Sequence, residues 1–553
     1  MPSQSHEAPW VPIARRKQAE RAARIPAKWH IPASVIPRDP PHLRDGPQNV
    51  LSVPRQFLSG LEISITEGYT IERLVKAISS RAFTAVQVAE AFCHRAAFAQ
   101  QLTNCLTEPL FDAALERAAF LDRYLSDNGK PIGPLHGLPV SVKDTFNVTG
   151  VDSSMGLASL CHKPATENAP LVNLLLSLGC VIIAKTNIPQ TLASLDSVNN
   201  VFGRTMNPIN RLCTAGGSSG GEGVLVAMKG SMIGIGTDIG GPGATAFTGS
   251  SHLTGACRTA GKSVEDIDTL LREIMPRASS WGEDCMPTPW SPTPRSMKAS
   301  GSGKNGELVI GVLRGDGNCV IHPPIANVLD EVAASLAHTA NIKVVPLHIP
   351  KALTVAQSVM NKLMGVDGSV PMLDMIEATG EPLVPWTAAR IKRGQPQPLT
   401  RVAEIQAQRS QIEREMLKIW VEDDEYGRRT QRVDAIVCPL APHPVPPIEG
   451  YNAVGLTSSW VLLDYPAGTV PVRNVEESDL ELGKPQDGKA ISSWDERNRE
   501  LWDETKIDRR LYLGTPLSVQ IVVPRLQDEK LVEVMGLVDA ACKGYTGRLK
   551  LKL

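Results

Sequence analysis

The sequence lacks several features that mark particular classes of protein. Aromatic residues make up only 5% of its 553 residues. No apolar run approaches the roughly 18 residues that a membrane-spanning helix needs. The 57 basic and 58 acidic residues leave a net charge of -1, so no electrostatic field draws in nucleic acid or anionic lipid. We therefore expect no transmembrane segment and no nucleic-acid partner.

Recognisable metal and disulfide patterns are also missing. The ten cysteines include no CxxC pair, and no apolar secretory segment precedes them, so we expect reduced thiols and a cytoplasmic location. The 11 histidines include no HxxxH or HExxH pair. His94, His136 and His252 are isolated, which favours surface or core positions. The sequence predicts no metal and no cofactor.

Glycine and proline are plentiful, and short β-branched runs alternate with helical patterns. Strand-like runs at 138–144 and 179–187 flank a helical segment with Pro170 near its start and Gly179 after its end. A small-residue helix and a buried strand follow within 220–238. This alternation predicts an α/β fold in which a central mixed sheet is covered by helices on both faces.

The rest of the chain fits the same plan. Residues 1–60 are basic and proline-rich, which predicts an N-terminal helical arm, and 61–547 then form a single domain. "LVIGVL", "PIANVLDEVAASLAHT" and "IKVVPL" form another strand, helix and strand. Residues 351–430 are charged and helical and are expected to be an insertion. Strands are expected again within 434–442 and 460–472.

Three segments carry residues suited to chemistry. Lys143 ends an apolar strand, where a lysine is usually a solvated cap. The loop "TAGGSSGGEG" (214–223) is either a flexible connector or, before a helix, a set of backbone N–H groups that favours an anion. "GIGTDIGG" (234–241) is either a tight turn or a nest of the kind that forms oxyanion holes.

Taken together, these segments resemble the amidase signature family, the serine hydrolases of amides. "GLPVSVKD", "GGSSGG" and "GTDIGG" match its words and its spacing, and the resemblance continues through "KTNIPQTLASLDSVNNVFGRTMNP", "SVEDIDTLL", "DAIVCPLAP" and "LLDYPAGTVPV". The likeness extends over roughly residues 60–545, and it identifies 61–547 as an amidase-like domain.

The resemblance implies a role for each matching residue. Lys143 would be the general base, which must be uncharged and which desolvation at a buried strand end can make so. Ser218, held by a cis peptide, would relay the proton between Lys143 and the nucleophile. Leu192 and the backbone of Ile239, Gly240 and Gly241 would line the acyl site and its oxyanion hole. The expected ligand is a small-molecule amide, and a homodimer is left open.

One position departs from the family. Pro242 stands where the nucleophilic serine is expected, and it has neither a hydroxyl nor an N–H. The flank "PGATAFTGSSHLTG" also differs from the family's "SIRxPAAFCG". Three interpretations follow: an amidase impaired by loss of its nucleophile, a displaced nucleophile at Ser250 or Ser251, or a catalytically inactive binding or scaffold protein.

A match of a different class lies nearby. "ACRTAGKS" (256–263) fits a loose phosphate-binding loop with Ala256 in the first glycine position, and a helix follows it. A true phosphate-binding loop follows a buried hydrophobic strand, which "TAFTGSSHLTG" does not supply. We therefore do not expect nucleotide hydrolysis.

Overall fold

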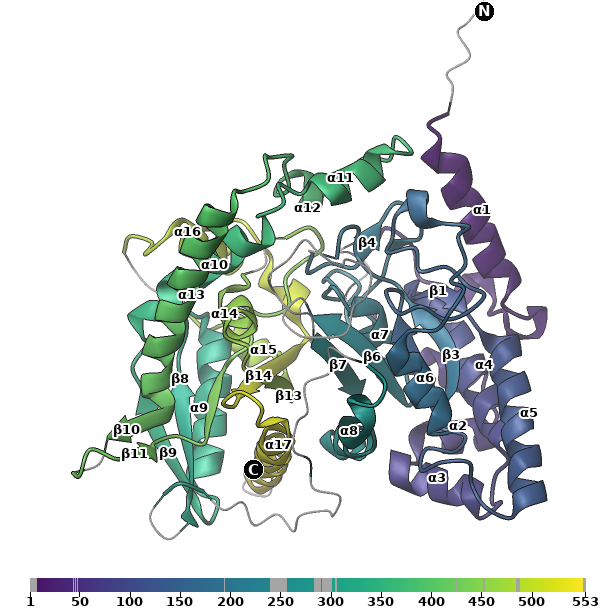
Figure 1. Ribbon diagram of the computed structural model, residues 1–553, viewed down its shortest axis with the longest axis horizontal. Helices are drawn as coiled ribbons and strands as arrows, with labels where there is room; N and C mark the ends of the chain where they lie inside the picture. Colours follow the sequence, from purple (N-terminus) through teal and green to yellow (C-terminus); the bar gives the residue numbers. More distant parts are fainter. Residues whose placement is uncertain are drawn as a thin grey trace, which may run out of the picture. The chain divides into compact units, whose positions relative to one another are not determined.

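The computed structural model describes residues 7–42, 44, 46, 48–192, 194–238, 256–282, 290, 301–303, 306–423, 425–450, 453–483 and 488–550 (Figure 1). The chain divides into two compact units. The first unit consists of Met1–Ser250, Thr254–Pro287 and Asp367–Pro396, and the second of Ser251–Leu253, Thr288–Val366 and Gln397–Leu553.

A five-stranded mixed sheet forms the centre of the first unit, in the order β1-β3-β2-β6-β7. The three inner strands are parallel, and both edge strands are antiparallel to their neighbours. The strands are β1 (Leu106–Pro109), β2 (Pro139–Lys143), β3 (Val181–Thr186), β6 (Ile233–Asp238) and β7 (Ala256–Gly261), with a separate hairpin of β4 (Val198–Asn199) and β5 (Gly203–Arg204).

Helices pack on this sheet because their apolar stripes match its buried strands. Helices α4 and α5 lie side by side and contact β3, while α7 contacts β2 and β6 (Figure 1). The helices of this unit are α1 (Trp10–Ala23), α2 (Gly60–Glu67), α3 (Ile71–Ser79), α4 (Ala85–Thr103), α5 (Phe111–Asn128), α6 (Pro170–Ser177), α7 (Gly220–Ala227), α8 (Val264–Ala278), α11 (Val370–Glu377) and α12 (Pro385–Ala388).

The N-terminal helix α1 is attached by a buried charge. Lys17 is 3% exposed, and its amine pairs with the carboxylates of Glu108 and Asp152, the latter at 2.6 Å. Burial lowers the pKa of Lys17, but the two carboxylates outweigh this effect and raise it above its usual value. The predicted helical arm therefore contains a helix anchored by an ion pair, and its boundary at residue 60 stays a prediction.

The second unit has its own five-stranded mixed sheet, in the order β13-β14-β12-β8-β9. Strands β12, β8 and β9 are parallel, and β14 is antiparallel to both of its neighbours. The strands are β8 (Leu308–Leu313), β9 (Ile342–Leu347), β12 (Ala435–Pro439), β13 (Ala467–Asn474) and β14 (Pro516–Val522), beside a small hairpin of β10 (Val421–Asp423) and β11 (Arg429–Gln431). The helices are α9 (Pro323–Ala337), α10 (Lys351–Met364), α13 (Leu399–Trp420), α14 (Gly455–Leu463), α15 (Glu477–Leu480), α16 (Ser493–Glu500) and α17 (Asp528–Lys550).

The predicted α/β fold with mixed sheets is confirmed. Among the described residues, and apart from two short hairpins, the strands pair in two five-stranded mixed sheets, one in each unit. Alternation of strands and helices does not specify which strands pair. One predicted strand is partly wrong. Within 460–472, residues up to Leu463 end helix α14, and β13 begins at Ala467. A short apolar run does not distinguish a buried strand from a buried helix.

Candidate active site

Lys143 ends strand β2, between the parallel neighbours β3 and β6. Its side chain is 0% exposed. The Lys143 amine donates a hydrogen bond to the Ser218 hydroxyl at 2.7 Å and to the Thr237 hydroxyl at 2.8 Å. The two residues paired in the sequence prediction, Lys143 and Ser218, are therefore in direct contact although they are 75 positions apart.

The loop that carries Ser218 depends on two glycines. Gly216 has a φ of 79°, a conformation that side chains rarely adopt. A Cβ at Gly217 would lie 2.5 Å from the Ser194 carbonyl oxygen, so a larger residue would push the two loops apart. The Gly217–Ser218 peptide is cis, as the resemblance implied. Ser218 itself is partly exposed.

Thr237 was not singled out from the sequence. It lies in β6, one position before the end of the strand, and reaches Lys143 from the neighbouring strand. Ser219 fixes the Thr237 backbone from the other side, because its hydroxyl accepts from the Thr237 N–H at 3.2 Å and donates to the Thr237 carbonyl at 3.1 Å. Its place in the "GTDIGG" motif was the available signal.

Glu222, in the first turn of α7, is a second residue that the sequence reasoning missed. Its buried carboxyl accepts from the Ser141 hydroxyl at 2.5 Å and the Thr186 hydroxyl at 2.7 Å. Ser141 is two positions before Lys143 on the same strand face, and Thr186 pairs with Lys143 across β2 and β3. Glycine at 234 leaves room for this carboxyl, since a Cβ there would overlap it.

The charge of this carboxyl depends on its surroundings. Burial raises the pKa of Glu222 to about 8, and the hydrogen bonds from Ser141 and Thr186 and the nearby Lys143 offset only part of that rise. Glu222 is therefore mostly protonated at neutral pH. A neutral carboxyl does not hold a positive charge on the lysine amine beside it, which is the condition for a lysine base.

Leu192 follows β3 in a loop of unusual backbone conformation. Thr191 and Leu192 have φ values of 73° and 61°, in the left-handed region that few residues other than glycine adopt. The neighbouring Gln190 donates to the buried Glu381 carboxylate at 2.6 Å, and Asn200 donates to the same group at 3.1 Å. Glu381 thereby ties the loop that carries Leu192 to the 367–396 segment of the same unit.

The other predicted site residues lie outside the described residues. They are the oxyanion-hole residues Ile239, Gly240 and Gly241, the nucleophile position Pro242, the alternative nucleophiles Ser250 and Ser251, and His252.

The phosphate-loop match has a structural explanation. Residues Ala256–Gly261 form strand β7, whose backbone pairs with β6. Lys262 donates to the carbonyl oxygens of Thr66 and Tyr69 at 3.3 and 3.2 Å. Backbone groups committed to a sheet do not wrap a phosphate, so the expectation that this segment binds no nucleotide agrees with its structure.

Two of the isolated histidines have core or ion-pair partners. His94 contacts the Glu62 carboxylate at 2.6 Å and stacks on Trp29, and His136 is buried, with its Nδ1 accepting from the Ile132 N–H. Within the described part of the chain, no group of three or more histidine, cysteine or acidic side chains could hold a metal ion. Among the same residues, no helix is long and apolar enough to cross a membrane.

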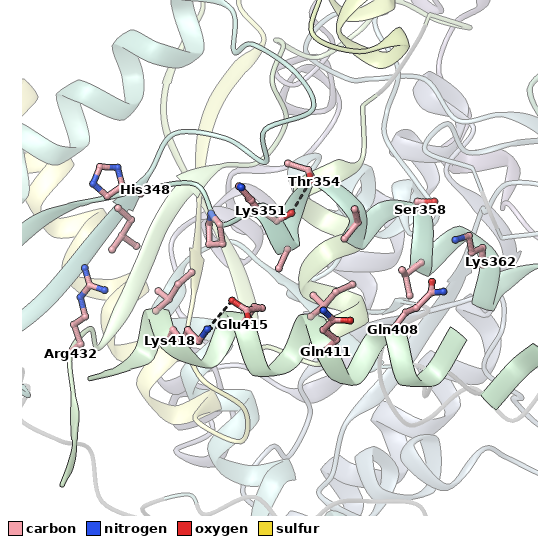
Figure 2. Close-up of a pocket in the computed structure, with 17 residues that line it drawn as sticks. His348, Lys351, Thr354, Ser358, Lys362, Gln408, Gln411, Glu415, Lys418 and Arg432 are labelled. Carbon is pink, nitrogen blue, oxygen red and sulfur yellow. Dashed lines mark hydrogen bonds and ion pairs between the residues drawn. The ribbon is translucent and has the colours of Figure 1, made fainter. Parts of the chain in front are cut away.

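A hollow of about 820 Å³ lies in the second unit, between α10 and α13 (Figure 2). Lys351 and Lys362 line it from α10, and Lys418, paired with Glu415, lines it from α13. None of the predicted catalytic residues lines this hollow. It is therefore separate from the Lys143–Ser218 cluster.

Comparison with known proteins gives consistent results. The family model described as "Amidase" matches residues 87–243 and 259–532, and the interruption coincides with the flank that departs from the family pattern. An acetamidase of Emericella nidulans is 32% identical over 95% of this chain and 97% of its own. An amidase of Gibberella moniliformis is also 32% identical, over 95% and 97%. A solved fatty acid amide hydrolase superposes with a TM-score of 0.83 at 25% identity, over 96% of this chain and 95% of that one.

Proposed function

Because this chain belongs to the amidase family, we propose that it acts on carboxylic acid amides at the Lys143–Ser218 cluster and releases a carboxylate and ammonia or an amine. An amide is a poor electrophile, so its cleavage needs an activated nucleophile, a proton donor for the leaving amine and donors for the oxyanion. The contact between the Lys143 amine and the Ser218 hydroxyl is the observation that carries this proposal.

Lys143 acts as the general base in this proposal, and Ser218 passes protons between it and the reacting groups. Lys143 is completely buried, as a lysine base needs to be, and a protonated Glu222 places no negative charge near it. The backbone of Ile239, Gly240 and Gly241 forms the oxyanion hole, and Leu192 lines the acyl site. These roles rest on the resemblance.

Pro242 makes this activity slow. Without the serine hydroxyl of the family, the usual acyl-enzyme does not form. Loss of one member of such a catalytic group leaves a residual rate of about 10³ to 10⁴ over water, from binding and oxyanion stabilisation. We propose an impaired amidase. The cytoplasmic location and the homodimer stay predictions.

The experiment measures ammonia or amine release from acetamide, an aryl anilide and a long-chain primary amide. The Pro242→Ser variant should exceed the unmodified chain by at least tenfold on one substrate, because it regains the hydroxyl. Lys143→Ala should abolish turnover in both backgrounds. Lys229→Ala is the matched control, because that lysine is partly exposed and pairs with Glu67 away from the cluster.

Calorimetric titration with the same amides tests binding separately. Absence of binding by the unmodified chain, together with absence of turnover by Pro242→Ser, would remove the proposed function. Amide binding with no turnover in either background would identify an inactive amide-binding protein instead.

A further inference from the structure

The Ser218 hydroxyl is in direct contact with the buried Lys143 amine, and this contact does not involve residue 242. The Ser218 Oγ is 2.7 Å from the Lys143 Nζ, so one proton transfer joins them. Lys143 is fully buried, whereas Ser218 as a residue is partly exposed, so Ser218 is the more accessible member of the pair. This is the arrangement of a serine–lysine dyad, a known variant of the serine nucleophile and its base.

We propose that Ser218 is the nucleophile of this chain and Lys143 its general base, in place of the relay role that the family pattern gives to Ser218. The inference rests on the proposed amide hydrolysis and names the group that receives the acyl chain. It follows from the position of the two side chains and from the absence of a hydroxyl at Pro242.

Thr237 also contacts the lysine amine, at 2.8 Å, but it is the weaker nucleophile of the two. Its hydroxyl is secondary, because the carbon that bears it also carries a methyl group. Its backbone N–H and carbonyl are both engaged by Ser219 on one side. The Thr237 hydroxyl is placed instead to orient the Lys143 amine toward Ser218.

The position of Ser218 beside a helix start also favours attack. Helix α7 begins at Gly220, so its positive end lies next to the serine, where negative charge develops. Within the described residues, no backbone carbonyl accepts a hydrogen bond from the N–H of Ser218 or Ser219. A nucleophile's own N–H commonly serves as an oxyanion donor in serine hydrolases.

The reaction balances without a cofactor. The Ser218 Oγ forms a bond to the amide carbonyl carbon while its proton moves to the Lys143 amine. The carbon–nitrogen bond then breaks, and the lysine ammonium gives that proton to the leaving nitrogen. Water next attacks the Ser218 ester and transfers a proton to Lys143, and this proton returns to the serine oxygen as the carboxylic acid leaves.

A fluorophosphonate probe locates the nucleophile, because the attacking oxygen displaces fluoride and keeps the phosphonyl group. Trypsin separates the candidates, since cleavage after Arg211, Lys229 and Arg258 places Ser218 in one peptide and Thr237, Ser250 and Ser251 in another. We expect the adduct in peptide 212–229, and fragment ions assign it to Ser218 and not Ser219. Ser218→Ala and Lys143→Ala should each slow labelling at least 100-fold, with the fold checked by circular dichroism.

A second measurement does not depend on the folding of an alanine variant at the serine. In a Ser218→Cys chain, the neighbouring lysine should stabilise the thiolate. Alkylation of the introduced thiol by iodoacetamide should therefore be at least tenfold faster than in the Lys143→Ala background at pH 7. Equal alkylation rates would overturn the dyad.

The outcomes separate the two proposals. The assignment of Ser218 would be overturned by an adduct on Thr237, Ser250 or Ser251. It would also be overturned if the unmodified chain gave no adduct while the Pro242→Ser chain was labelled at residue 242. The proposed amidase function would stand in both cases. Absence of amide binding and of turnover in both the unmodified and the Pro242→Ser chains would remove the proposed function itself.

Discussion

At the residue scale, the site contains two buried ionisable groups, Lys143 and Glu222, and the charge of each affects that of the other. Lys143 ends strand β2, and the Glu222 carboxyl of helix α7 is held by hydrogen bonds from Ser141 and Thr186 of the same sheet. A charged Glu222 would favour a charged lysine, whereas a protonated Glu222 leaves the amine able to accept a proton. The raised pKa of Glu222 is therefore compatible with the chemistry proposed for Lys143.

Replacing Glu222 with glutamine should change how stability depends on pH. The folded pKa is about 8 and the reference value is 4.5, so between these values the unfolded chain has lost a proton that the folded chain keeps. Stability conferred by the neutral form is complete below the lower value and falls as pH rises toward the upper one. In urea unfolding, the free energy of unfolding of Glu222→Gln minus that of the unmodified chain should therefore rise by about 2 kcal/mol or more from pH 5 to pH 8.

The matched control for this experiment is Glu116→Gln, at an exposed position of α5 in the same unit. Its free energy of unfolding should differ from that of the unmodified chain by the same amount at both pH values. If the corresponding difference for Glu222→Gln is also the same at pH 5 and pH 8, the carboxyl is not buried in its protonated form.

At the scale of elements, helix α1 is attached to the rest of the first unit through a buried group of charges as well as through apolar packing of Trp10 and Ile13. The Lys17 amine contacts carboxylates from β1 and from the 152 region, and Arg24 adds a second contact to Glu108. The same cluster continues to Lys185 in β3, whose amine donates to the Asp152 carbonyl at 2.5 Å. Two members of this network, Glu108 and Lys185, belong to strands β1 and β3 of the sheet that also carries Lys143.

Lys17→Met should therefore be strongly destabilising. It leaves Asp152 buried without its cation and Glu108 with Arg24 alone, and removing one partner of a buried ion pair typically costs about 3 to 5 kcal/mol. Arg16→Met, one position earlier, removes an exposed ion pair with Glu20 and should cost less than about 0.5 kcal/mol. Thermal unfolding followed by circular dichroism measures the stability of both variants. If both lose the same amount of stability relative to the unmodified chain, Lys17 does not anchor α1.

At the scale of the whole molecule, each of the two units has its own mixed sheet, and the cysteines that the structure describes are buried. Cys93, Cys105, Cys161, Cys180, Cys213, Cys319, Cys438 and Cys542 are buried and keep their thiols outside any disulfide. Burial raises the pKa of each of these thiols above its usual value, so little reactive thiolate is present.

Iodoacetamide should leave these eight thiols unmodified in the native protein for hours at pH 8 and label them fully in urea, as mapped by peptide mass spectrometry. A Ser126→Cys variant supplies the positive control, because this position on α5 is exposed. Labelling of any of the eight at the rate of the Ser126→Cys thiol would show that the core opens in the native state.

Much of the local structure was predictable. Pro170 begins α6 as expected, and Thr84 and Gln87, three positions apart, form a capping box at the start of α4. The strand that ends at Lys143 and the helix that begins beyond Ser219 also match. Each of these depends on neighbours a few positions away, which the sequence presents directly.

The sequence by itself determined which residues could carry the chemistry, since strand ends, glycine turns and the missing hydroxyl at Pro242 are local properties. Only the tertiary structure decided that Thr237 contacts Lys143, that Glu222 lies under Ser141, and that Lys17 enters the sheet's charge network. These contacts join residues up to 135 positions apart. They depend on which strands pair and in what register, and no periodicity along the chain records that choice.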